Sequence, residues 1–130
     1  MAFRNMISKY LNNHAETQDN HWDPTLRTHY YKTTKEKAMR AIEEILGQSE
    51  TYELHSISEE HGEISAKVKK RRQAFIIVTI IMVRPFQTAV DFSVTTETAL
   101  PFDFGYSTKI IQRLYKEINH VLPLITKQAR

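Results

Sequence analysis

Residues 75–83 read Phe-Ile-Ile-Val-Thr-Ile-Ile-Met-Val, and eight of these nine residues are apolar. Most of their side chains are β-branched, which makes them stiff at χ1 and suits a pleated sheet better than a helix. The run is far shorter than the roughly 20 residues of a membrane-spanning helix, and Arg84 closes it. Apolar side chains occupy both sets of alternating positions, so both faces of the predicted strand need cover. The strand therefore requires a sheet with material packed on each side.

Helical patterns lie on both sides of the strand region. Thr33 precedes Glu36 by three residues, the spacing of a capping box for a helix that starts at Thr33 or Thr34. The apolar residues that follow repeat at helical spacing as far as Leu46, and Gly47 is expected to stop this helix in a left-handed conformation. A last helix is expected from Ser107, as its cap, to residue 125, with Pro123 interrupting it.

Alternating or continuous β-prone runs occupy residues 29–32, 51–58, 63–70 and 88–96. Gly62 supplies the positive φ of a hairpin turn between the second and third runs. The order strand, helix, four strands, helix predicts an α+β fold. We expect a curved antiparallel sheet with both long helices on one face, in the element order of the TATA-box-binding-protein-like and helix-grip folds.

The amino-terminal part adds a short amphipathic helix and a polar loop. The helix has an apolar stripe made of Phe3, Met6, Ile7, Tyr10 and Leu11. We expect it to pack on the sheet face opposite the long helices, with a homodimer through that face as the competing arrangement. Residues 12–27 are expected to form a loop with Trp22 tucked against the core. The predicted organisation is thus 1–27 as helix and loop and 28–130 as a single α+β domain.

Residues 89–96, 103–107 and 110–114 together resemble the end of the bacterial domain-of-unknown-function family 1499. In that family a Ser- and Arg-rich strand precedes an Asp-x-Gly-x-Asn turn and a basic final helix. Here Thr95-Thr96 replaces the Ser-Arg pair, and Ser107 stands where Asn is usual. The resemblance covers mainly residues 89–118, and it implies no activity because the family is itself uncharacterised.

Composition limits the chemistry available to this chain of 130 residues. It has no cysteine and a net charge of +3, so disulfide and thiolate sites are excluded. The first residues lack an uninterrupted apolar leader segment, which predicts a cytoplasmic location. The six histidines form no close ligand pair; only His14, Asp19, His21 and Asp23 could converge from the loop, and we expect no metal and no cofactor.

No nucleophile and base stand at a diagnostic spacing, so an enzyme is not predicted. Asp91 and Arg84 could form an acid–base or ligand-binding pair, but a structural ion pair is preferred. For Asp91 itself, the preferred interpretation is a solvated or hydrogen-bonded strand aspartate. The leading hypothesis is a non-enzymatic binding module whose sheet and final helix enclose a pocket for a small hydrophobic molecule or present a face to a protein partner. The residues expected at the pocket are Phe92, Phe102, Phe104, Tyr106 and Leu114.

An alternative function comes from a basic run at the end of the predicted hairpin. It contains Lys67, Lys69, Lys70, Arg71 and Arg72. Five cations in six residues can contact phosphates of nucleic acid or acidic lipid, and we expect such binding to be weak and non-specific. The competing interpretation is that these charges protect the adjacent apolar strand from aggregation.

Overall fold

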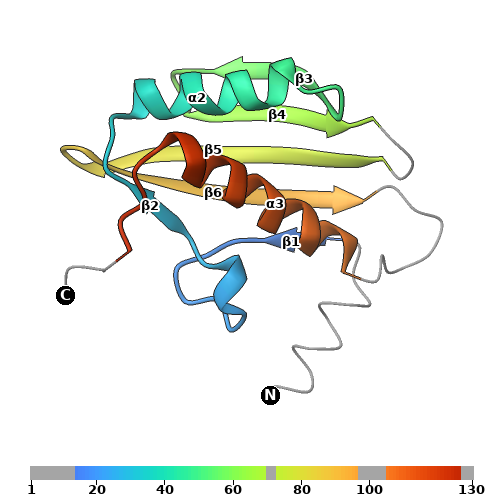
Figure 1. Ribbon diagram of the computed structural model, residues 1–130, viewed down its shortest axis with the longest axis horizontal. Coiled ribbons are helices and arrows are strands. Elements are labelled where there is room, and N and C mark those ends of the chain that lie inside the picture. Colours follow the sequence, from blue (N-terminus) through green and yellow to red (C-terminus); the bar gives the residue numbers. More distant parts are fainter. Residues whose placement is uncertain (1–13, 70–72, 97–104, 127–130) are drawn as a thin grey trace.

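The computed structural model describes residues 14–69, 73–96 and 105–126. Six antiparallel strands form one sheet, and two helices lie across one of its faces (Figure 1). The elements are β1 (His14–Glu16), the 3₁₀ turn η1 (Pro24–Leu26), β2 (His29–Tyr31), α2 (Lys35–Gln48), β3 (Tyr52–Ser58), β4 (Glu63–Val68), β5 (Ala74–Arg84), β6 (Gln87–Thr96) and α3 (Tyr106–Val121). The predicted α+β class, with a sheet and two long helices, is confirmed.

The strands follow the order β1-β6-β5-β4-β3, and β2 also pairs with β6. β1 and β2 share one edge of β6: β1 pairs with residues 93–95 and β2 with residues 88–90. The prediction of an uninterrupted loop over residues 12–27 is wrong at β1. Its three residues are extended because they pair with β6, which is distant in the sequence. No local sequence pattern predicts such a pairing. Trp22 also differs from expectation, because it is 41% exposed.

The core lies between the sheet and the helices. Alternate residues of the strands point toward the helices and are buried, in agreement with the period of two in β4 and β6. The largest fully buried side chains of the core are Tyr31, Ile42, Leu46, Ile64, Ile76, Val78, Ile80, Val90, Phe92, Ile111, Leu114 and Ile118. α2 and α3 each contribute one apolar stripe to this layer.

The start of α2 agrees with the sequence prediction, and the predicted stop of α2 and cap of α3 do not. Thr34 is the N-cap of α2, and its hydroxyl accepts a hydrogen bond from the Lys37 amide at 3.2 Å. Gly47 lies inside α2, which continues to Gln48, so the predicted left-handed stop at Gly47 is wrong. Ser107 is not the cap of α3: Gly105, with φ of 81°, occupies that position. The Ser107 hydroxyl is instead used across the core, where it hydrogen-bonds Thr96 at 2.7 Å.

The sheet face opposite the helices is partly apolar. On β5, Phe75, Ile81 and Val83 point to this side and are 41%, 51% and 50% exposed. The predicted helix over residues 3–11 lies outside the described residues. In the described part of the chain, no helix is long and apolar enough to cross a membrane.

Candidate functional site

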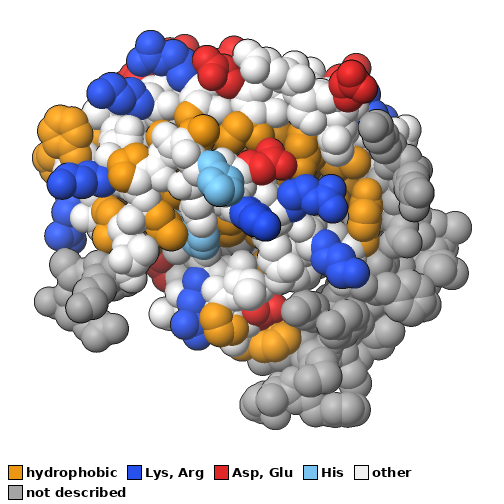
Figure 2. All heavy atoms as spheres, viewed as in Figure 1, with side chains coloured by type: hydrophobic (Ala, Val, Ile, Leu, Met, Phe, Trp, Pro, Cys, Tyr) orange, Lys and Arg blue, Asp and Glu red, His pale blue; other side chains and the backbone are white. Residues whose placement is uncertain are grey.

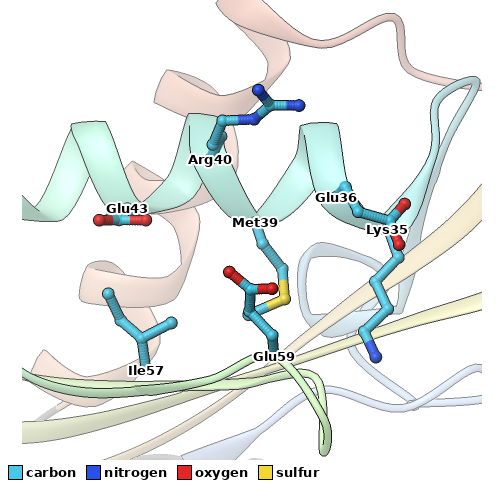
Figure 3. A pocket seen from close by; sticks show the side chains of 7 residues that line it. All are labelled: Lys35, Glu36, Met39, Arg40, Glu43, Ile57 and Glu59. Carbon is cyan, nitrogen blue, oxygen red and sulfur yellow. The ribbon is translucent and has the colours of Figure 1, made fainter.

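A hollow of about 350 Å³ opens between α2 and the end of the β3–β4 hairpin (Figure 3). We refer to it as the α2–β3 hollow. Its lining comprises Lys35, Glu36, Met39, Arg40, Glu43, Ile57 and Glu59. Five of these seven positions lie on α2 and two on β3 and its turn, so the hollow exists only because the helix packs across this hairpin.

A β-bulge places the apolar floor of the hollow. β3 pairs with β4 through Leu54↔Ala66 and Ile57↔Ile64, and the register shifts between Leu54 and Ser56. Positions three apart on a regular strand point to opposite faces, but the extra residue of a bulge restores a common face. Ile57 therefore points toward α2, and Met39 extends from α2 toward the hairpin at the side of it (Figure 3).

The two floor residues differ in exposure. Met39 is 5% exposed and belongs to the core, whereas Ile57 is 38% exposed. An Ile side chain left this open beside a concave surface offers apolar area that a ligand can bury. The floor is therefore the part of the hollow suited to an apolar group.

Charged side chains form the rim. Glu59 rises from the β3–β4 turn beside Met39, and Glu43 lies above Ile57 on α2 (Figure 3). The Arg40 guanidinium is turned away from the sheet, and the Lys35 chain extends along the far side of the hollow. With three carboxylates and two cations among the lining residues, the rim favours a positive charge on whatever lies over the floor.

The residues predicted to line a pocket occupy different surroundings. Phe92 and Leu114 are 2% and 1% exposed and are packed in the core between the sheet and α3. Phe92 meets the Tyr115 ring edge-on with 4.9 Å between centroids. Tyr106 is half-buried against the same core, and Phe102 and Phe104 lie outside the described residues. None of the five lines the α2–β3 hollow, so a pocket at those residues stays a prediction.

The basic run is described only at its beginning. Lys67 is half-buried on the face away from the helices, opposite Phe75 in the β4–β5 register. Lys69 is exposed, and its amide donates to the Thr51 carbonyl at 2.9 Å. Lys70, Arg71 and Arg72 lie outside the described residues, and the anion-binding function of the run remains a prediction.

A polar cluster lies beneath α3. The His29 ring stacks on Tyr115 with 3.6 Å between centroids. Tyr31 donates its hydroxyl hydrogen to Asn119 at 2.6 Å, and Tyr115 donates to the Val90 carbonyl at 2.6 Å. Burial lowers the pKa of His29 below its usual 6.5 and raises the pKa of both tyrosines. In the described chain no buried side-chain polar atom lacks a partner, so this cluster is a satisfied structural network.

Asp91 holds the edge of the sheet together. Its carboxylate accepts hydrogen bonds from the Thr17 and Thr28 hydroxyls, each at 2.6 Å. The β5–β6 register places Asp91 opposite Thr79 and Arg84 opposite Gln87. The predicted hydrogen-bonded aspartate is confirmed, and the predicted pairing of Asp91 with Arg84 is excluded by their separation along the hairpin.

The residues considered as metal ligands form hydrogen bonds with different partners. His14 hydrogen-bonds Thr95, Asp19 accepts from the Tyr30 hydroxyl, and Asp23 accepts from the Thr25 amide. Within residues 14–69, 73–96 and 105–126, no three His, Cys, Asp or Glu side chains converge to hold a metal ion.

Comparison with known proteins returns no matching family model, no matching curated protein and no matching solved structure. The resemblance of residues 89–118 to the domain-of-unknown-function family 1499 stays a prediction. The case for function therefore depends on the geometry of the molecule.

Proposed function

We propose that this chain is a non-enzymatic binding module that holds a small, largely hydrophobic molecule in the α2–β3 hollow. The observation that carries the proposal is the open apolar floor, where Ile57 is 38% exposed and Met39 extends from α2 toward the hairpin. The hollow has a volume of about 350 Å³, at the lower end of the range for ligand sites, roughly 300–1,000 Å³. A compact ligand with an apolar body fits that space.

The rim supports a ligand that also carries a positive charge. Glu43 and Glu59 stand at the edges of the floor, while the Arg40 guanidinium turns away from it. An amine attached to an apolar body would place its charge between carboxylates and its carbon chain over Ile57. The proposed ligand class is therefore an amphiphilic amine.

Binding is favoured over catalysis by the lining itself. Its seven residues include carboxylates and cations but no Ser, Thr, Cys or His. The usual pairing of a nucleophile with a general base is thus missing from the lining of the hollow.

The fold gives general support. The element order and helix placement agree with an assignment to the helix-grip and TATA-box-binding-protein-like arrangements, which we propose for this chain. Such an analogy concerns architecture and leaves function to the site. In such an arrangement a helix lies across the β3–β4 hairpin and leaves space beneath it.

Calorimetric titration with decylamine, decanol and decanoate below their micelle concentrations tests the proposed function. We expect affinity to decrease in that order, because the three probes share a chain length and differ in charge. Glu43→Gln and Glu59→Gln should each weaken decylamine binding by about two- to fivefold, the range of a partly exposed ion pair. Decanol binding should stay unchanged in both variants.

Two further variants complete this experiment. Glu53→Gln is the matched control, since Glu53 is an exposed β3 carboxylate that does not line the hollow. Ile57→Trp should fill the floor and remove binding of all three probes. Binding that survives Ile57→Trp would contradict the proposed site.

The alternative function, an anionic-surface binder, has one supporting observation: half-buried Lys67 lies opposite Phe75 on the partly apolar face, and exposed Lys69 follows the end of β4. If the run from Lys67 to Arg72 contacts about four phosphates, the log–log salt dependence of duplex DNA binding should have a slope of about −3 to −4. Changing the five cations to Gln should abolish that binding. A slope near zero, or binding unaffected by the substitutions, would contradict this function.

A further inference from the structure

The end of the β5–β6 hairpin carries a cluster of exposed apolar side chains. Ile81, Met82, Val83 and Phe86 are 51%, 43%, 50% and 61% exposed. We call these four residues the hairpin tip. They are half of the large hydrophobic side chains that stay exposed in the described chain, and they lie within six consecutive positions.

The strand register explains why the tip projects. β4 begins at Glu63, opposite Thr79, and the Ile80 amide donates to the Gly62 carbonyl at 2.7 Å. Beyond Ile80, β5 pairs only with β6. Ile81 and Val83 point to the open face, whereas Met82 points to the helix side and is nevertheless exposed. The tip is therefore apolar on both faces and at its turn, and it is convex where the α2–β3 hollow is concave.

The turn holds an aromatic ring outward at a conformational cost. Phe86 has φ of 58°, the one non-glycine residue with a positive φ in the described chain. This left-handed conformation is unfavourable for a side chain with a Cβ. The ring is 61% exposed, so packing in the core does not offset that cost. Contact with a surface outside the folded chain would bury the Phe86 ring.

Cations stand next to the tip. Arg84 pairs with Gln87, and Lys32 follows Tyr31, whose partner on β6 is Thr88. Arg84 is therefore adjacent to the turn of the hairpin, and Lys32 follows the end of β2 on the other side of β6. Figure 2 shows hydrophobic side chains beside Lys and Arg side chains at the end of the molecule where the hairpin projects, on the left. Glu59 and Glu60 lie on the β3–β4 turn shortly before Gly62, whose carbonyl accepts a hydrogen bond from the Ile80 amide.

We propose that the hairpin tip docks on the surface of an anionic phospholipid bilayer. Phe86 and its aliphatic neighbours would enter the boundary between headgroups and acyl chains, and Arg84 and Lys32 would contact lipid phosphates. A convex apolar tip with adjacent cations matches such a surface. A peptide partner would need a groove or a long free strand edge, and β5 offers only four residues beyond β4. This inference is independent of ligand binding in the α2–β3 hollow.

The test places the single tryptophan at the tip. Trp22 is the only tryptophan of the chain, so the double variant Trp22→Phe/Phe86→Trp reports from the tip alone. Its fluorescence is measured with phosphatidylcholine vesicles that contain or lack phosphatidylserine. We expect a blue shift with the anionic vesicles, and quenching by lipids brominated on the acyl chain near the headgroup.

Variants without the probe separate binding from folding. Phe86→Gly removes the ring and relieves the backbone, so its unfolding midpoint should equal or exceed that of the native chain. In co-sedimentation with anionic vesicles, we expect Phe86→Gly to lower partitioning about tenfold, the effect of one lost partly buried aromatic ring. Phe75→Ser is the matched control, because Phe75 is an exposed phenylalanine at the other end of β5; its partitioning should be unchanged.

Three results would overturn the proposal. One is an unchanged tryptophan spectrum with anionic vesicles, and a second is native partitioning for Phe86→Gly. The third is concentration-dependent self-association without lipid that Phe86→Gly removes, which would assign the tip to a second copy of the chain.

Discussion

Gly62 and Gly47 show how one residue type can have opposite energetic roles in this chain. Gly62 has φ of 67°, and a Cβ there would collide with the Ile80 carbonyl oxygen across the hairpin. Gly47 is helical, and a Cβ there would meet no atom within 4 Å. The first glycine is required by backbone conformation and close approach, and the second only adds freedom to the unfolded chain.

Exchanging each glycine for alanine should therefore shift stability in opposite directions. Gly62→Ala should lower the free energy of unfolding by at least about 2 kcal/mol. The new Cβ disfavours the left-handed backbone and pushes residue 62 away from the Ile80 carbonyl. Gly47→Ala should raise it by about 0.5–1 kcal/mol. Urea unfolding followed by circular dichroism measures both, and a change of the same sign in the two variants would contradict the assignment.

His29 makes stability depend on pH. Burial against Tyr115 lowers its pKa in the folded protein, whereas Asn119 and Asp91 act in the opposite direction to a smaller extent. The unfolded chain, with a pKa near 6.5, then binds more protons than the folded chain as the pH falls. The His29 contribution is complete above that value and is lost as the pH falls toward the folded-state pKa.

We therefore expect the melting temperature to decrease between pH 7.5 and pH 5.5, with a smaller decrease in His29→Gln. Differential scanning calorimetry at the two pH values gives the comparison. Equal decreases in both proteins would show that His29 is not the titrating group.

At the scale of elements, α2 depends on a single capping side chain. Thr34 has extended backbone and accepts from the Lys37 amide, so it satisfies one of the amide groups left free at the helix start. Because α2 forms one wall of the hollow, loss of the cap should loosen the end of the helix that carries Lys35 and Glu36.

Thr34→Ala should cost about 1 kcal/mol of stability, and Thr34→Asn should cost little because Asn caps equally well. Chemical denaturation of the two variants supplies the measurement. If Thr34→Asn destabilises as much as Thr34→Ala, the side-chain cap is not the source of the effect.

At the scale of the whole molecule, the sheet face that bears the exposed side chains of Phe75 and Ile81 needs cover. The sequence predicts that the apolar stripe of residues 3–11 packs there. The described chain begins at His14, whose ring hydrogen-bonds Thr95, and Thr95 lies opposite Phe75 in the β5–β6 register. His14 thus lies at the sheet edge next to the β5–β6 pair that carries Phe75.

Deleting residues 1–11 while keeping β1 should expose the face and cause self-association. Sedimentation velocity at several concentrations should then show a rising sedimentation coefficient for the truncated protein and a constant one for the full chain. A truncated protein that stays monomeric and equally stable would contradict this packing. A dimer already present in the full chain would assign the cover to a second copy.

Much of the fold could be predicted from local signals. The α2 stripe, the Gly62 turn, the long apolar strand and the alternation of Val90, Phe92 and Val94 all follow from backbone sterics and side-chain periods. The candidate site was not predicted. Its only signal is an apolar Ile57 among polar neighbours, and that signal becomes meaningful only once the bulge turns the side chain toward α2.

The sequence by itself determined that α2 and α3 become helices and that β2 to β6 become strands, because those choices depend on residues within a few positions of one another. Tertiary structure decided everything that depends on partners distant in the chain. The pairing of Glu16 with Ser93 made a strand of β1, and the end of β4 opposite Thr79 left the hairpin tip uncovered. Such pairings form only when the whole core closes, since the apolar surface buried by many distant residues together offsets the entropy of joining them.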